Sequence, residues 1–155
     1  MSVMTQEQVR ALVGRGGVKA DAGRPAPPVP PRTVRLPWPP SVNDYWTRTK
    51  RGNRLSERAK RFHAEATAEW LTRGAPTFGE AEVRLLVDLY PPADHRQHDT
   101  DNTTKAIGDA LQKCGVLADD HQIAWWDLRR RFRSGKGFVD VTIERLSEHD
   151  SEATR

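Results

Sequence analysis

Apolar residues follow a regular pattern only between about residues 33 and 146, and this interval limits what the chain can fold into. Before it stands the segment GRGGVKADAGRPAPPVPPR, which is rich in glycine and proline and cannot bury enough apolar surface to offset its ordering entropy. We therefore expect a flexible Gly/Pro-rich extension at 1–32, one folded domain at 33–146 and a disordered polar tail at 147–155.

The folded interval contains strand patterns and helix patterns in a definite order. Strand patterns lie at 33–38, 81–90, 122–133 and 137–146, and helix patterns lie at 57–73 and 103–114. The last two strands are joined by Ser-Gly-Lys, a short connection typical of a hairpin. The resulting β-α-β-α-β-β order predicts an α+β domain of two layers, with the helices on one face of a mixed sheet.

Local signals fix the helix ends. Ser56 is suited to cap the first helix, and Gly115 is suited to the left-handed position that ends the second. Gly108 inside the second helix costs roughly 1 kcal/mol relative to alanine, which close helix packing would explain. The stretch 41–54 is predicted to be turn and loop. The buried stripe of the first helix consists of Phe62, Ala66 and Trp70.

Composition excludes several classes of protein. The chain has one cysteine, Cys114, so an intramolecular disulfide and a four-cysteine zinc site are impossible, and the reducing cytoplasm is the expected compartment. Neither an apolar run of about 18 residues nor the apolar core of a secretion signal is present, so no membrane partner is expected. The net charge of +4 allows a polyanion as partner without requiring one.

Acidic residues gather at both ends of the second helix pattern. Asp99 and Asp101 precede it at i and i+2, so their side chains point the same way in extended chain. Asp119 and Asp120 follow it, and Asp120 can join the first pair only if the chain then folds back beside the strand ending at Tyr90. Clustered carboxylates repel, and oxygen-only ligands suit Mg²⁺ or Mn²⁺ better than zinc.

A purely structural alternative exists for these residues. Asp101 or Asn102 would serve as an ordinary helix N-cap, and Lys105 would then be a surface ion-pair partner of Asp101 worth about 0.3–0.5 kcal/mol. Two histidines nearby, His95 and His98, are further candidate ligands, although loop histidines are more often merely solvated.

Two basic runs accompany the acids. The first, residues 48–61, includes Arg48, Lys50, Arg51 and Arg54, and the second, residues 129–136, includes Arg129, Arg131 and Arg133. Aromatic residues stand beside both runs, a combination that favours nucleic acid as the partner, with the basic side chains neutralising phosphates.

The segments LPWPPSVNDYW and HDTDNTTKAIGDALQKCGVLADDHQI together resemble the RusA family of Holliday-junction resolvases, over roughly residues 34–145. The resemblance implies a homodimeric, Mg²⁺-dependent endonuclease that cuts four-way DNA junctions, in a family often found in phages or prophages. It places the catalytic and metal-binding carboxylates at Asp99, Asp101 and Asp120 and the essential basic residue at Lys105, and it leaves the role of Asp119 open. The stretch ADHRQH is less arginine-rich than is usual in the family.

Three functions remain open from the sequence. The first is a resolvase that makes paired symmetric incisions in recombination and repair. The second is another metal-dependent nuclease acting on flaps or forks with the same site. The third is a non-catalytic protein that binds branched DNA, in which the acids only cap and pair. Metal-dependent nicking separates the third from the others, and paired incision separates the first from the second.

Overall fold

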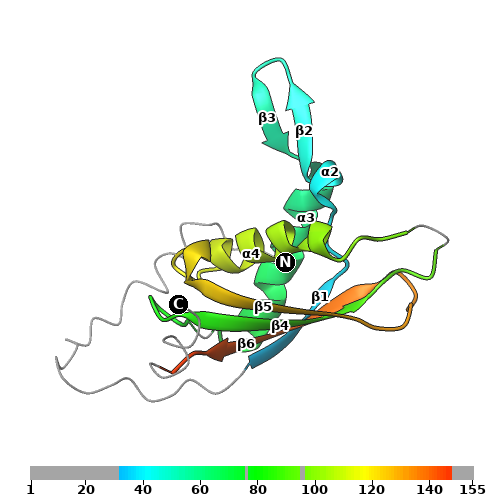
Figure 1. The fold of residues 1–155 in the computed structure, drawn as a ribbon. Coiled ribbons are helices and arrows are strands. Elements are labelled where there is room, and N and C mark those ends of the chain that lie inside the picture. The colour runs from blue at the N-terminus through cyan, green and yellow to red at the C-terminus, as the bar shows by residue number, and fades with distance from the viewer. Residues whose placement is uncertain (1–31, 76, 95–96, 148–155) are drawn as a thin grey trace.

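The structure of the protein is a computed structural model that describes residues 32–75, 77–94 and 97–147 (Figure 1). Its centre is a four-stranded sheet in the order β1-β6-β4-β5. Strand β5 runs parallel to β4, whereas the β1–β6 and β6–β4 pairs are antiparallel, so the predicted mixed sheet of an α+β fold is confirmed. The strands are β1 (Arg32–Pro37), β4 (Val83–Tyr90), β5 (Ile123–Arg130) and β6 (Phe138–Arg145).

Two long helices cover one face of this sheet, and the core lies between them and the strands. In β4 every second residue, from Val83 to Leu89, is fully buried, while the alternate residues are only half-buried. The predicted stripe of Phe62, Ala66 and Trp70 on α3 is also buried. The helices are α2 (Val42–Tyr45), α3 (Glu57–Thr72) and α4 (Thr104–Lys113), with the 3-10 turns η1 (Asp101–Thr103) and η2 (Asp120–Gln122).

The predicted helix ends are confirmed. The Ser56 side chain accepts the backbone N–H of Ala59 at 3.1 Å. Gly115 adopts φ 76°, and the N–H of Val116 returns to the carbonyl of Leu111 at 3.0 Å, as expected for a left-handed helix end. In the described part of the chain, every helix is too short or too polar to cross a membrane. The extension 1–32 lies outside the described residues apart from Arg32, which opens β1, and the tail beyond Ser147 is also outside them.

The stretch predicted as loop contains a β-hairpin instead. Strands β2 (Trp46–Thr49) and β3 (Gly52–Leu55) pair antiparallel in a separate two-stranded sheet. Together they form a ribbon, hereafter the arm (residues 46–55), that projects away from the body beside α2 and α3 (Figure 1). Gly52 turns the chain with φ 111°, and the Thr49 hydroxyl donates to its carbonyl at 2.7 Å. No residue of the arm is fully buried, and only its base packs on the body, through Leu55 against the core and Trp46 against Tyr45, so backbone pairing is the main interaction along the rest of the ribbon.

The predicted hairpin between the last two strands is wrong, because β4 lies between β5 and β6. Strand β4 is the most regularly buried strand and takes a central position. The connection after β5 crosses the end of β4. There the N–H of Arg131 donates to Leu89 O at 2.8 Å, and the N–H of Ser134 donates to Pro91 O at 2.9 Å. The N–H of Ala93 donates to Gly135 O at 2.9 Å, so this connection also holds the start of the loop that leads to Asp99.

Two glycines differ in the space around them. A Cβ built on Gly108 would lie 3.8 Å from side-chain atoms of Ile123 and Trp126, an ordinary contact, whereas one on Gly137 would lie 2.7 Å from the backbone nitrogen of Pro92. Gly137 also has φ 77°. The packing around α4 therefore permits alanine at Gly108, and the expected packing reason for this glycine is not found.

We predict that Gly108→Ala raises the free energy of unfolding by up to about 1 kcal/mol, because it removes the helix penalty of glycine without a clash. Gly137→Ala should lower it by about 1–3 kcal/mol, through overlap with Pro92 and strain at positive φ. Urea unfolding followed by circular dichroism measures both. If the Gly108→Ala protein were less stable than wild type, α4 would lie closer to β5 than the 3.8 Å distances to Ile123 and Trp126 indicate.

Candidate active site

The first predicted pair of carboxylates lies where the chain leaves β4 and enters α4. Asp99 and Asp101 are both exposed. Asn102 contacts both of them: its backbone N–H donates to Asp101 Oδ1 at 3.0 Å, and its side-chain amide donates to Asp99 Oδ2 at 3.4 Å. No other hydrogen bond to these side chains is made by the described residues, so one oxygen of each carboxylate stays available to a ligand.

No side-chain cap closes the start of α4. Neither Thr100 before η1 nor Thr103 before α4 accepts a backbone N–H through its side chain. The hydroxyls of Thr103 and Thr104 instead donate to the carbonyls of Thr100 and Asp101, at 2.6 and 2.8 Å. The alternative in which Asp101 or Asn102 is the N-cap of α4 is therefore contradicted, although Asp101 still accepts the backbone N–H of Asn102 within η1.

Lys105 pairs with a carboxylate that the sequence analysis did not single out. Its ammonium lies 3.2 Å from Asp109 Oδ2, one helical turn onward, rather than beside Asp101. It also stands 5.9 Å from the centre of the Tyr45 ring. The ion pair with Asp101 that the purely structural alternative requires is not formed, and the Lys105 side chain remains partly exposed.

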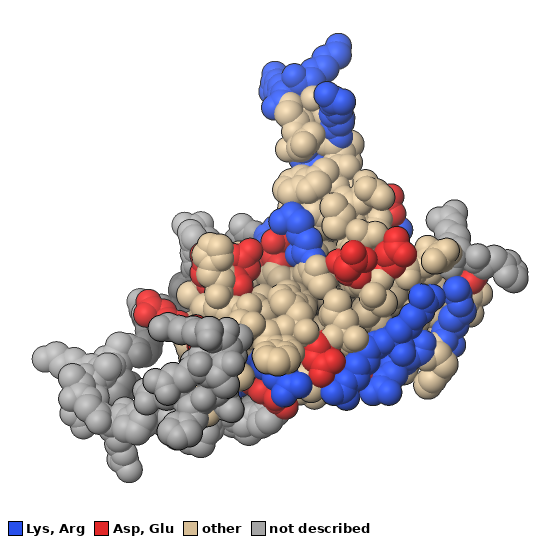
Figure 2. Space-filling view, viewed as in Figure 1, with Lys and Arg blue, Asp and Glu red and all other residues tan. Residues whose placement is uncertain are grey.

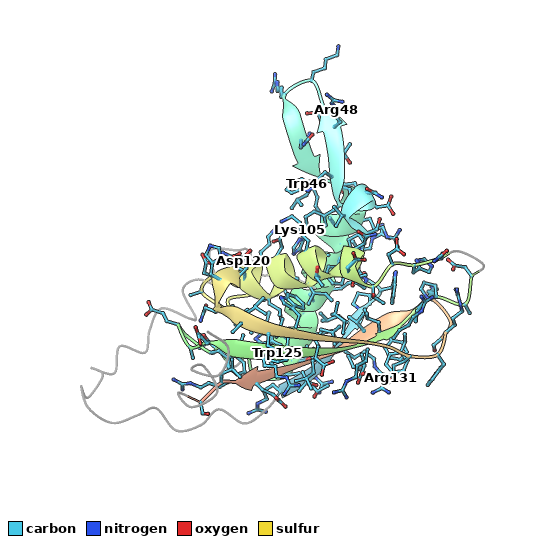
Figure 3. The ribbon with its side chains drawn as sticks, in the orientation of Figure 1. Trp46, Arg48, Lys105, Asp120, Trp125 and Arg131 are labelled. Carbon is cyan, nitrogen blue, oxygen red and sulfur yellow. The ribbon has the colours of Figure 1, made fainter. Side chains whose placement is uncertain are left out.

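Asp120 and Lys105 share one groove beside α4. The groove has a volume of about 300 Å³, and its lining residues are Thr104, Lys105, Gly108, Asp109, Asp120, Ile123 and Trp126. Figure 3 shows Lys105 above α4 and Asp120 near the start of β5. A basic side chain and two carboxylates therefore border a single open space.

Asp120 does not join Asp99 and Asp101 within one chain. After α4 the chain does return beside β4, which was the condition for Asp120 to meet the first pair. However, Ile123 pairs with Val83 at the start of β4, whereas Asp99 follows the end of β4. Among the described residues, the one acidic or histidine group of three whose ligand atoms lie within 4.8 Å is Asp119, Asp120 and His121. A single chain thus presents the predicted carboxylates as two separate groups.

Asp119, whose role the sequence left open, caps η2. Its side chain accepts the N–H of His121 at 2.9 Å, while its own N–H donates to Gln122 Oε1 at 2.9 Å. The bond from His121, followed by a hydrogen bond with Asp120, lowers the pKa of the Asp119 carboxyl. Gln122 is buried and its amide donates to Gly79 O at 2.6 Å, which anchors the turn that presents Asp120.

The two candidate histidine ligands differ in their surroundings. His98 Nε2 lies 2.9 Å from Asp94 Oδ1, and its ring packs edge-on against Trp38 at 5.4 Å between centres. One of its nitrogens is therefore already engaged. His95 lies outside the described residues.

The two basic runs form surfaces of different character (Figure 2). In the second run, Arg129 pairs with Asp127 at 2.9 Å and Arg131 with Asp88 at 2.8 Å. Arg133 donates to the carbonyls of Pro92 and Asp94. In the first run, the candidates on the arm make no ion pair with any described residue. These are Arg48, Lys50, Arg51 and Arg54.

A family model described as Endodeoxyribonuclease RusA matches residues 37–144. The chain belongs to the RusA family. The crossover junction endodeoxyribonuclease RusA of Escherichia coli K12 is 28% identical over 115 residues, which cover 74% of this chain and 94% of that protein. The protein of the same name from Enterobacteria phage 82 is 28% identical over 114 residues, which cover 73% and 93%. The predicted family membership and the assignment as an endodeoxyribonuclease are confirmed.

The segment LPWPPSVNDYW (residues 36–46) of this RusA-family chain supports both the loop that carries Asp99 and the arm. Trp38 packs on His98, and both line a second groove of about 270 Å³ together with Asp99. Ser41 begins α2 by accepting the N–H of Asp44 at 3.3 Å. The motif thus leads to Tyr45, the residue from which the arm departs.

Sequence reasoning missed Asp109 and Gln122 as parts of the site. The spacing of Asp119 and Gln122 matches a capping box and was available as a signal. Asp109 carries no comparable signal, because a lone aspartate inside an amphipathic helix usually lies on its solvated face.

We predict that Asp119→Ala lowers the free energy of unfolding by about 1 kcal/mol, because it removes the side-chain cap of η2. Asp119→Asn should preserve stability, since asparagine is an equally good cap. Thermal unfolding compares the two variants. Equal stability of Asp119→Ala and wild type would contradict the capping role, and loss of DNA cleavage in Asp119→Asn would reveal a further role for the charge.

Proposed function

We propose that this RusA-family chain is a divalent-metal-dependent endonuclease that resolves four-way DNA junctions by paired symmetric incision, in the cytoplasm. The observation that carries the proposal is the exposed pair Asp99 and Asp101, which is joined through Asn102 and is not used to cap α4. The relatives of the chain are named crossover junction endodeoxyribonucleases, which supports this substrate.

The donor set fits Mg²⁺, with Mn²⁺ as a substitute. Asp99, Asp101 and Asp120 are exposed carboxylates, and hard cations of this kind prefer oxygen ligands completed by water and phosphate oxygens. When bound, the ion would supply an activated water and offset negative charge on the phosphate. Asn102 orients the first pair, through its backbone N–H to Asp101 and its side-chain amide to Asp99, and Lys105 offers positive charge to the same phosphate.

A homodimer reconciles this donor set with the fold. A four-way junction offers two equivalent strands, and a two-fold dimer presents two equivalent sites to them. Because one chain holds Asp120 apart from Asp99 and Asp101, a second copy is the source that would complete each site. The separation within the chain is then a property of the protomer and not of the assembled site.

The arm is proposed to bind the DNA backbone. Its four basic side chains extend from a ribbon that stands clear of the body, and none forms an ion pair with a carboxylate of the described residues (Figure 2). Exposed Trp46 lies at its base and offers a surface for contact with DNA bases or sugars. Arg129, Arg131 and Arg133, being paired with acids or carbonyls, would contribute less per residue.

We predict that Asp99→Asn, Asp101→Asn and Asp120→Asn each abolish cleavage of a synthetic four-way junction while binding survives. Each change removes a charged oxygen ligand and keeps the side-chain shape. The measurement is a Mg²⁺-dependent nicking gel beside a binding assay in Ca²⁺. Near wild-type cutting by all three variants would show that these carboxylates are not the catalytic site, whereas absence of Mg²⁺-dependent nicking by the wild-type protein would leave a non-catalytic binding protein as the better description.

The dimer adds a second prediction. A mixture of the Asp99→Asn/Asp101→Asn protein with the Asp120→Asn protein should recover part of the activity that both lack, because a mixed dimer contains one complete site. Cutting of one strand without its symmetric partner is the expected product. No recovery after subunit exchange would show that each chain completes its own site.

Neutralising the arm should weaken binding to all DNA structures. The variant Arg48→Gln/Lys50→Gln/Arg51→Gln/Arg54→Gln is expected to bind the junction less tightly, with the slope of log Kd against log salt reduced by about 0.9 for each phosphate that the arm no longer neutralises. Arg129→Gln/Arg131→Gln/Arg133→Gln is the matched comparison, with a smaller change in slope. A salt dependence unchanged by the arm substitutions would remove the arm from the DNA interface.

A further inference from the structure

A series of hydrogen bonds, buried at Tyr45 and His63 and exposed at its other end, leads from the base of the arm to Lys105. The Tyr45 side chain is 1% exposed, and its hydroxyl donates to Asp109 Oδ2 at 2.8 Å. His63 Nε2 lies 2.8 Å from the same hydroxyl. Asp109 in turn holds the Lys105 ammonium, at 3.2 Å from Oδ2 and 3.4 Å from Oδ1. Of these four residues, the proposed function uses only Lys105.

The direction of each bond is fixed by its neighbours. Because the Tyr45 hydroxyl gives its hydrogen to the Asp109 carboxylate, its oxygen must accept from His63 Nε2–H. Burial, followed by the charge of Lys113, lowers the pKa of the His63 imidazole and keeps it neutral, so Nδ1 carries no hydrogen. This Nδ1 is buried without a partner among the described residues.

An unpartnered buried nitrogen costs about 1–3 kcal/mol, which a phenylalanine in place of His63 would avoid. The core therefore retains a polar group that it does not need for packing. What His63 supplies is a donor that turns the Tyr45 hydroxyl toward Asp109. The arrangement therefore orients the Tyr45 hydroxyl toward Asp109 at a cost to the stability of the core.

Tyr45 also connects this chain of bonds to the arm. It is the last residue of α2, and Trp46 begins β2 immediately after it. Its carbonyl accepts the N–H of Ser56 at 3.0 Å, which closes the other end of the arm, and its ring packs edge-on against Trp46 at 5.1 Å. Both strands of the arm thus leave the body at the residue whose hydroxyl contacts the partner of Lys105.

We infer that Tyr45 and Asp109 are positioning residues for Lys105, which place its ammonium for the phosphate and join it to the DNA-binding arm. The inference rests on the proposed role of Lys105. A lysine side chain has many rotamers, and a charged partner that is itself held by a buried hydroxyl reduces this freedom before substrate arrives. Preorganised charge is what stabilises negative charge developing on a phosphate.

Tyr45→Phe tests the inference, because it keeps the buried ring and removes the hydroxyl alone. We expect single-turnover cleavage of a four-way junction, at saturating protein and Mg²⁺, to slow about tenfold, equivalent to about 1.4 kcal/mol. Junction affinity and thermal unfolding should stay near wild type. Tyr90→Phe is the matched control: Tyr90 lies on the other face of the sheet, stacked on Phe138, and its variant should cut at the wild-type rate.

A double-mutant cycle with Lys105→Met separates positioning from a general structural effect. Lys105→Met should slow cleavage by about 100-fold or more on its own. In that background, Tyr45→Phe should add less than about twofold, because the hydroxyl then has nothing to position. If the two effects multiply instead, Tyr45 acts independently of Lys105 and the inference is overturned.

Other outcomes are equally decisive. Wild-type cleavage by Tyr45→Phe beside a slow Lys105→Met would overturn the inference and leave the proposed role of Lys105 intact. Wild-type cleavage by Lys105→Met would overturn both. If Tyr45→Phe does not fold, Asp109→Asn replaces it in the same cycle, because the amide keeps an acceptor for Tyr45 and removes the charge that holds Lys105. Asp109→Asn should then show the same reduction in rate and the same non-additivity.

Discussion

The parallel pairing of β4 with β5 is the constraint on which the rest of the structure depends. Parallel neighbours require a crossover, and here the crossover is the acidic loop, η1, α4 and η2. One end of that crossover carries Asp99 and Asp101, and the other end carries Asp120. The groove beside α4, with Lys105 and Asp109 on its wall, is a consequence of laying this helix over β5. The candidate site residues are therefore concentrated in one connection of the sheet.

Much of the fold could be predicted because its core elements bury one face. The alternation of apolar residues in β4 and the apolar stripe on α3 result from that burial. Ser56 and Gly115 indicate helix ends through a side-chain cap and a positive φ. The arm was missed since its side chains are largely exposed and leave no alternation to detect. The pairing of the last two strands was mispredicted because a short connection between strands is typical of a hairpin, whereas β4 lies between β5 and β6 in the sheet.

The site was predictable only as far as its residues act locally. Asp99, Asp101 and Asn102 lie together because they are close in sequence. The ion pair of Lys105 with Asp109 could not be predicted, since Asp101 and Asp109 stand equally far from Lys105 along the chain and the contact of Asp109 with Tyr45 is tertiary. The second basic run was predicted from its charge. Charge alone does not show that Arg129 and Arg131 already form ion pairs with Asp127 and Asp88.

The attachment of the arm at Tyr45 and Ser56 has a consequence for how such proteins can diversify. Because one backbone hydrogen bond closes both ends, residues can be added to the ribbon without disturbing the core. Two residues inserted in each strand would extend its reach by about 7 Å and keep every side chain on its own face. A single insertion would turn the outer side chains over. The length of the arm can therefore change in steps of two residues per strand, while the candidate site residues at α4 stay unchanged.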